Sequence, residues 1–181
     1  DAIATAISIG FPISVTRSDD DFYPLMVANS YFGEHRTFNG RLMNQMRGLR
    51  GLNYGDYSYI ENFIQDGGST FPLPNIPRRQ QFFSIWIRPV PHHNAAFALR
   101  QAVFELNRLV EFGLSLDDFE ATREYLINYS KLYVQTTSRR LGYLLDSRFY
   151  GTEFFVDEIM TRLPTLTVDA VNAALRRHLQ A

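Results

Sequence analysis

The segment QFFSIWIRPVPHHNAAFALRQAVFELNRLVEF, residues 81–112, decides the fold class of this chain, because it holds a strand followed by a helix. Its first part alternates, which places Phe83, Ile85 and Ile87 on one face of a strand. Residues 94–112 repeat apolar side chains at helical spacing, as expected for a helix that lies on a sheet. The stripe expected to be buried is formed by Ala98, Ala102, Leu106 and Leu109 and is widened by Leu99, Val103 and Val110.

The rest of the chain supplies two more strands and several helices. Strands are expected near residues 2–10, 53–63 and 80–88. Helices are expected over residues 18–33, 38–50 and 94–112, after a Ser115 cap, and after a Thr167 cap. Pro12 predicts a loop over residues 11–18. Because strands and the helical half come in separate runs, the sequence predicts an α+β fold with a mainly antiparallel sheet and helices packed on one face. Residues 1–181 are expected to form a single domain.

Composition excludes several classes of protein. The 181 residues are 45% hydrophobic and carry a net charge of −1, so nucleic acid is not expected as the main partner. No run of about 18 apolar residues is present, and no membrane span is expected. The absence of cysteine excludes disulfides and thiolate chemistry. Because a strand is expected directly after Asp1, we expect this chain to be a piece of a longer protein.

The histidines and acidic residues do not predict a catalytic or metal site. No two of the four histidines have the i, i+4 spacing that lets helical imidazoles share one zinc ion. The adjacent His92 and His93 are typical of a polar loop before a helix. The acidic run from Asp19 to Asp21 is typical of a solvated helix start, and no Gly-x-Ser-x-Gly motif is present. The sequence therefore predicts no metal ligand and no catalytic residue in this chain.

A basic helix end precedes a tyrosine-rich strand. Four arginines and no acid lie between Glu34 and Asp56. The 38–50 helix is expected to bury Leu42, Met46 and Leu49, with Arg47 beside this stripe. Tyr54 follows Arg47 by seven residues, across the turn at Gly51 and Leu52. A guanidinium and a phenol hydroxyl are both donors that can hold one peptide carbonyl. On the pattern alone, a solvated helix end beside ordinary strand aromatics is the more common interpretation.

The run FNGRLMNQMRGLRGLNYGDYSY, residues 38–59, resembles the second-half domain of the insulinase/pitrilysin family of zinc metallopeptidases. That domain carries a Ser/Asn-x-Arg-Leu helix and then Leu-Arg-x-x-x-Gly-Leu-x-Tyr, which residues 39–42 and 46–54 match with substitutions. Three further landmarks follow the family order: IG-P at residues 9–12, VEFGLSLDDFEATREYLIN at 110–128 and LPTLTVDAVNAALRRHL at 163–179. Glu34–Thr37 replaces a usual Gly-rich link, and Asn53 stands where Ala or Gly is common.

The resemblance implies a clamshell of two homologous halves. The first half carries His-x-x-Glu-His and a distal Glu that hold zinc, and the second supplies an Arg/Tyr pair for the substrate backbone. By position that pair is Arg47 and Tyr54. This chain would then be the substrate-binding, non-zinc half of a peptide-hydrolysing enzyme, inactive alone. Its partner would be the zinc-binding half, in the same chain or in a separate subunit, and the periplasm or cell envelope of a bacterium suits the design.

Two alternatives stay open. Some members of the family have lost peptidase activity and serve as structural subunits of larger complexes. An unrelated interaction module that uses aromatic strands is also compatible with the 14% aromatic content. A His-x-x-Glu-His motif in the sequence upstream would favour the peptidase over the structural subunit.

Overall fold

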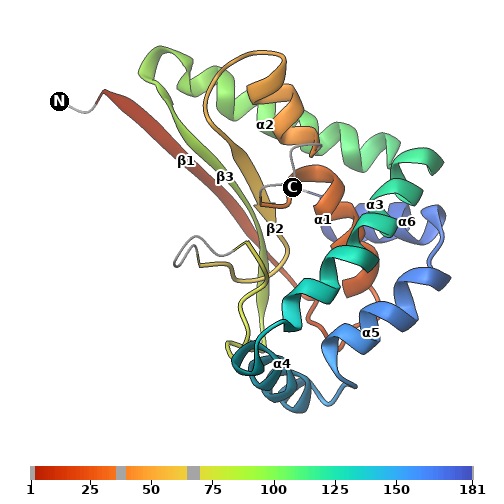
Figure 1. The fold of residues 1–181 in the computed structure, drawn as a ribbon. Coiled ribbons are helices and arrows are strands. Elements are labelled where there is room, and N and C mark those ends of the chain that lie inside the picture. Colours follow the sequence, from red (N-terminus) through yellow and green to blue (C-terminus); the bar gives the residue numbers. More distant parts are fainter. Residues whose placement is uncertain (1–2, 36–39, 65–69, 181) are drawn as a thin grey trace.

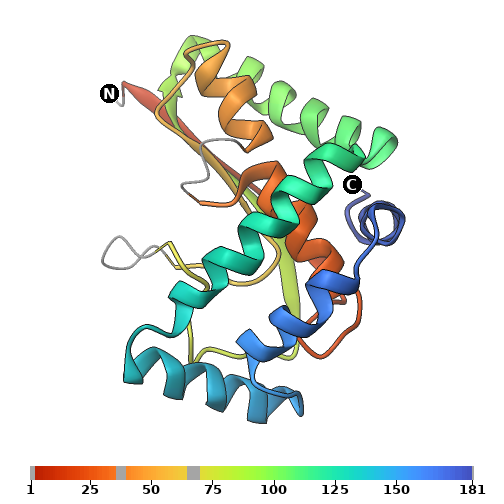
Figure 2. The same cartoon turned by 45° about the vertical axis from the view of Figure 1, so that its right-hand side comes forward.

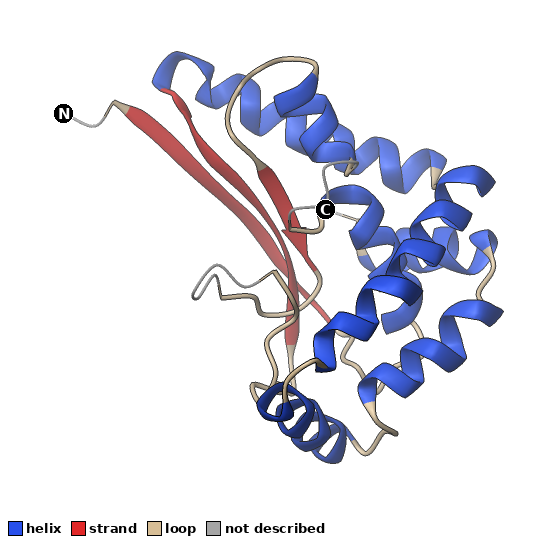
Figure 3. Cartoon of the chain, viewed as in Figure 1, coloured by secondary structure: helices blue, strands red, loops and turns tan. Residues whose placement is uncertain are grey.

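A computed structural model describes residues 3–35, 40–64 and 70–180. It contains one antiparallel sheet of three strands in the order β1-β3-β2. The strands are β1 (Ala4–Ile13), β2 (Asp56–Tyr59) and β3 (Gln81–Pro91). The helices gather on one side of this sheet (Figure 1 and Figure 3). The predicted α+β class, with an antiparallel sheet and helices on one face, is confirmed.

The described residues form six α-helices. They are α1 (Phe22–Gly33), α2 (Ala95–Phe112), α3 (Leu116–Tyr129), α4 (Thr137–Tyr150), α5 (Phe155–Arg162) and α6 (Val168–His178). Short turns of other helix types are η1 (Met43–Gly48), η2 (His92–Asn94), η3 (Ser130–Val134) and η4 (Leu163–Thr165). The predicted caps are confirmed, because the hydroxyls of Ser115 and Thr167 accept the amides of Asp118 and Ala170.

The helix α1 is the centre of the core. Its sequence FYPLMVANSYFG is apolar on nearly every side, which is typical of a fully buried helix. It contacts β2, α3 and α6, and Figure 2 shows α3 crossing in front of it. On the neighbouring strand Phe83, Ile85 and Ile87 are at most 2% exposed, as the alternation predicted.

A second, smaller apolar cluster lies at the β2 side of the sheet. It consists of Met43, Tyr57, Tyr59, Phe63 and Trp86. Tyr57 pairs directly with Trp86 across β2 and β3. Because Met43 belongs to η1, this cluster anchors η1 to the sheet.

The first two strands differ from their predicted bounds. β1 continues through Pro12 to Ile13, so the loop predicted over residues 11–18 begins later. β1 lies at an edge of the sheet, where a residue without an N–H group disturbs little pairing. β2 has only four residues, and Tyr54 precedes it in a bend instead of lying in the strand.

Two apolar residues were predicted to be buried and are not. Leu49 is 73% exposed, because η1 is a π-helical turn. Its i→i+5 winding moves the following residues out of the 3.6-residue register on which the stripe was based. Leu99 is 40% exposed, while Ala98, Ala102, Leu106 and Leu109 are all buried. The buried stripe of α2 is therefore narrower than predicted. Residues 38 and 39 of the predicted 38–50 helix lie outside the described residues.

Candidate functional site

The chain reverses direction directly after Arg47. The amide of Gly51 donates to the carbonyl oxygen of Arg47 at 2.9 Å, and the amide of Leu52 donates to that of Met46 at 3.1 Å. Gly51 has a φ of +59°, the left-handed conformation that glycine adopts without a steric penalty. This closing turn ends η1 and directs the chain back toward the sheet.

The reversal places Tyr54 beside Arg47. The guanidinium carbon of Arg47 lies 4.7 Å from the centroid of the Tyr54 ring, which is cation–π geometry. Tyr54 is 71% exposed, and Arg47 is partly buried. The two residues singled out from the sequence therefore lie together at the protein surface, with the guanidinium over the face of the ring.

The segment after Tyr54 is fixed by a polar residue. The side-chain amide of Asn53 donates to Asp56 Oδ1 at 2.7 Å and to the carbonyl oxygen of Arg88 at 2.9 Å. The amide of Arg88 in turn donates to the carbonyl oxygen of Gly55 at 3.1 Å. Asn53, which departs from the family pattern, thus ties the bend that carries Tyr54 to β3.

Two neighbouring arginines, Arg41 and Arg50, bind other groups of the protein. Arg50 donates to the main-chain oxygen of Gln45 at 2.7 Å. Arg41 forms an ion pair of 2.6 Å with Glu105 of α2, which is 2% exposed. Arg36 lies outside the described residues. These contacts hold the helical turn in place.

Three of the four histidines contact neighbouring side chains. His35 stacks on Tyr57 with 4.1 Å between ring centroids, and its Nδ1 lies 2.7 Å from the Tyr59 hydroxyl. His92 Nδ1 lies 2.7 Å from the Thr5 hydroxyl, and His178 Nε2 lies 2.7 Å from Asp21 Oδ2. Within residues 3–35, 40–64 and 70–180, no group of three or more His, Cys, Asp or Glu could hold a metal ion. The described residues do not fit a zinc ion.

Sequence reasoning missed a buried ion cluster around Arg17. Arg17 is 6% exposed and binds Glu61 through two nitrogens, at 2.9 and 3.0 Å, and Asp146 at 3.3 Å. Its guanidinium carbon lies 4.1 Å from the centroid of the Phe155 ring. The partners lie 44 and 129 residues away along the chain, so no local pattern marked them.

The acidic run before α1 differs in part from its predicted role. Asp20 pairs with Arg162 of α5 at 2.7 Å, and Asp21 pairs with Arg177 of α6 at 2.6 Å. The predicted solvated helix start holds for Asp19 and Asp20, which are exposed, whereas Asp21 is half-buried because α6 brings a basic side chain to it. The run joins the two halves of the chain.

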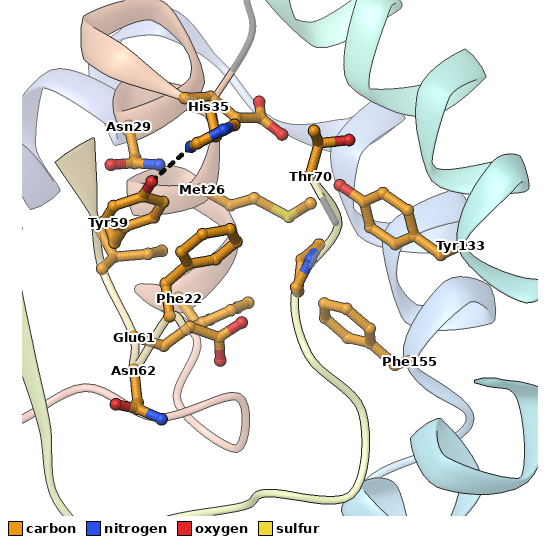
Figure 4. A pocket seen from close by; sticks show the side chains of 14 residues that line it. Phe22, Met26, Asn29, His35, Tyr59, Glu61, Asn62, Thr70, Tyr133 and Phe155 are labelled. Carbon is orange, nitrogen blue, oxygen red and sulfur yellow. Dashed lines mark hydrogen bonds between the residues drawn. The ribbon is translucent and has the colours of Figure 1, made fainter. Parts of the chain in front are cut away.

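A cavity of about 60 Å³ lies beyond the end of β2. Figure 4 shows it between side chains of α1, the segment after β2, η3 and α5. Phe22, Met26 and Phe155 form apolar walls, and polar atoms come from Glu34, Thr70 and Tyr133 among others. Burial raises the pKa of the Glu34 carboxyl to about 7, although a hydrogen bond from Ser30 opposes this.

Comparisons with known proteins agree with this architecture. No protein-family model matches the chain. An uncharacterized zinc protease of Streptomyces coelicolor is 25% identical over 173 residues, covering 94% of this chain and 33% of that protein. The chain thus spans about a third of the length of this curated relative.

Solved structures superpose over almost the whole chain. The M16 peptidase inactive domain from Pseudomonas fluorescens matches 99% of this chain and 39% of its own, with a TM-score of 0.79 and 21% identity. The inactive peptidase domain of a zinc protease from Bordetella parapertussis matches 99% of this chain and 89% of its own, with a TM-score of 0.72 and 16% identity. The chain has the fold of an M16 peptidase domain. The resemblance to the insulinase/pitrilysin family is thereby confirmed.

The M16 fold bears on the alternatives. It argues against an unrelated interaction module, because the similarity covers the whole chain and not only the aromatic strands.

The periplasmic protease PqqL from Escherichia coli has the same fold, with a TM-score of 0.68, 12% identity and coverage of 98% of this chain and 18% of its own. Within the described ranges, every helix is too short or too polar to cross a bilayer.

Proposed function

We propose that this chain is the substrate-binding, non-catalytic half of a zinc-dependent metalloendopeptidase. Arg47 and Tyr54 hold the backbone of the bound peptide. The observation that carries the proposal is the contact of 4.7 Å between the Arg47 guanidinium and the exposed Tyr54 ring. Similarity to a zinc protease and to inactive domains of M16 peptidases supports it.

The chemistry of the pair suits a peptide carbonyl. A guanidinium carries several N–H donors in one plane, and the tyrosine hydroxyl adds a donor on the same surface. Contact with the ring restricts the rotation of the long arginine side chain, so less freedom is lost when a ligand binds. A carbonyl oxygen accepts from both groups without reference to the side chains of the peptide. The pair therefore provides affinity for peptide backbone of many sequences.

The zinc chemistry belongs to a homologous partner half, in the same chain or in a separate subunit. When bound there, the metal supplies Lewis-acid activation for peptide hydrolysis. The residues of this chain bind and orient the peptide, and the chain alone is inactive. Similarity to the periplasmic PqqL supports a place in the periplasm or envelope of a bacterium.

The test is Arg47→Ala in the enzyme assembled with its zinc-bearing half. Loss of a charged hydrogen bond to substrate costs about 1.5–3 kcal/mol, so kcat/KM should fall by roughly tenfold to hundredfold. Tyr54→Phe should give a smaller decrease. The matched control is Arg50→Ala, which removes an arginine bound to the Gln45 carbonyl and should leave kcat/KM within about twofold.

Two outcomes would contradict the proposal. If Arg47→Ala mainly unfolds the protein while the folded fraction keeps its specific activity, the pair is structural. If the assembled parent cleaves no peptide and its partner half holds no zinc, the chain is a scaffold subunit with the same fold.

A further inference from the structure

The cavity beyond β2 holds an acidic group that has no nearby cation among the described residues. Glu34 lines it, and among the described residues its hydrogen-bond partner is the Ser30 hydroxyl one helical turn earlier. Burial raises the pKa of Glu34 to about 7, which means that the carboxylate form is poorly stabilised at this place. A positive charge in the cavity would restore that stabilisation.

A second polar group in the same cavity lacks a partner. Tyr133 is completely buried, and its hydroxyl has no hydrogen bond to any described residue. Figure 4 shows this hydroxyl directed toward Thr70 and the cavity. A buried hydroxyl without a partner destabilises the fold, so its orientation into a cavity points to a ligand with a complementary polar group.

Two other polar groups around the cavity already have partners. Glu61 also lines it, but Arg17 binds both of its carboxylate oxygens, at 2.9 and 3.0 Å. His35 Nδ1 lies 2.7 Å from the Tyr59 hydroxyl, as the dashed line in Figure 4 shows. Glu34 is therefore the lining carboxyl that remains for a ligand in the part of the chain that the structure describes.

The walls and the size restrict what fits. Phe22, Phe63 and Phe155 contribute ring surfaces, which attract cations through their π-electrons. A water molecule needs roughly 10–15 Å³ of such volume, and a cavity of about 150 Å³ accommodates benzene. A cavity of about 60 Å³ therefore admits a group of one to a few heavy atoms.

We propose that this cavity binds a primary ammonium group, with Glu34 as its counter-ion, the Tyr133 hydroxyl as a hydrogen-bond acceptor and aromatic rings as walls. The ammonium group comes either from a free small amine or from the end of a lysine side chain of a bound peptide. The site uses neither Arg47 nor Tyr54 and does not depend on the proposed peptidase role.

The experiment is a titration of the chain with methylammonium chloride at constant ionic strength, followed by NMR of the Glu34 carboxyl carbon and the Tyr133 ring. We expect saturable shifts at both residues, and a decrease of the Glu34 pKa by at least one unit at saturation. Affinity should rise from pH 6 to pH 8 as Glu34 ionises. Tetramethylammonium, which is bulkier and has no N–H group, should give no shifts.

Variants assign the site to these groups. Glu34→Gln should abolish binding, and Tyr133→Phe should weaken it about threefold to tenfold, a typical effect of losing one neutral hydrogen bond. The matched controls Glu124→Gln and Tyr125→Phe change exposed residues of α3 and should bind like the wild type. If Glu34→Gln does not fold, Tyr133→Phe still tests the site, because it removes only a hydroxyl without a partner.

Three results would overturn the proposal. They are the absence of saturable shifts, equal binding by Glu34→Gln, and equal shifts with tetramethylammonium. A parallel titration with N-acetyl-lysine methylamide distinguishes the sources. Binding of both compounds assigns the site to a lysine side chain, and binding of methylammonium alone assigns it to a free amine.

Discussion

Arg17 and Arg47 both lie over aromatic rings, yet they occupy opposite environments. Arg17 is 6% exposed and has two carboxylates within 3.3 Å. Arg47 lies at the surface, over a tyrosine that is 71% exposed. A buried guanidinium is fixed by the charges that compensate it, whereas a surface guanidinium can exchange water for a ligand. The comparison separates an arginine that stabilises the fold from one suited to binding.

The largest expected effect is the loss of stability when the buried Arg17 is replaced. Arg17→Met leaves Glu61 and Asp146 without their shared cation, and removal of one partner from a buried ion cluster typically costs about 3–5 kcal/mol. Urea unfolding measures the loss. Arg148→Met, on the exposed face of α4, is the control and should change stability by less than about 0.5 kcal/mol. A loss below about 1 kcal/mol for Arg17→Met would show that the cluster adds little.

The second effect concerns the turn that brings Arg47 to Tyr54. Gly51→Ala forces a side chain into the left-handed region at φ +59°, at a cost of about 1–2 kcal/mol. No atom lies within 4 Å of the added carbon, so the cost is conformational and not steric crowding by neighbours. Gly48→Ala, in the preceding helical turn, is the control and should be neutral or slightly stabilising. If both variants unfold at the same urea concentration, the turn does not need glycine.

The third effect is a pH dependence of stability caused by the buried carboxyl groups of Glu34 and Asp56. Burial raises the pKa of Glu34 to about 7 and that of Asp56 to about 6 in the folded protein. The folded state then holds protons that the unfolded state releases, so stability is greatest in acid and falls as the pH rises from about 4 to 7. Glu34→Gln should flatten this decline and melt higher than the wild type at pH 8. Melting temperatures of the wild type and the variant between pH 5 and 8 measure this difference. If both melting temperatures fall equally with pH, Glu34 is not the group responsible for the decline.

The smallest effect is expected for Arg47, the arginine at the surface. Arg47→Ala removes a surface cation–π contact worth about 0.5–1 kcal/mol, so the melting temperature should change little. Urea unfolding of this variant beside Arg17→Met gives the contrast directly. If both variants lose the same stability, the distinction between the two arginines is wrong.

Local periodicity was enough to predict β3, α2 and the capped starts of α3 and α6, because these elements bury one regular face. The Arg47–Tyr54 neighbourhood was also predictable, since only seven residues and one glycine turn separate the two side chains. The exposure of Leu49 was not, because a π-helical turn changes the spacing without a sequence signal. Arg17 and Tyr133 were missed for another reason. Their neighbours come from distant segments that only the folded chain brings together.

The short strand β2 sets the distance between Tyr54 and the cavity beyond β2. From Asp56 to Tyr59 the chain covers about 10 Å at the usual rise of an extended chain. Tyr54 lies two residues before the start of this strand, and Tyr59, its last residue, lines the cavity beyond β2. Pairing with β3 fixes the strand in length and direction. Insertion of two residues into β2 keeps the alternation of side chains, so it would move Tyr54 away from the cavity by about 7 Å without turning Tyr59 to the other face.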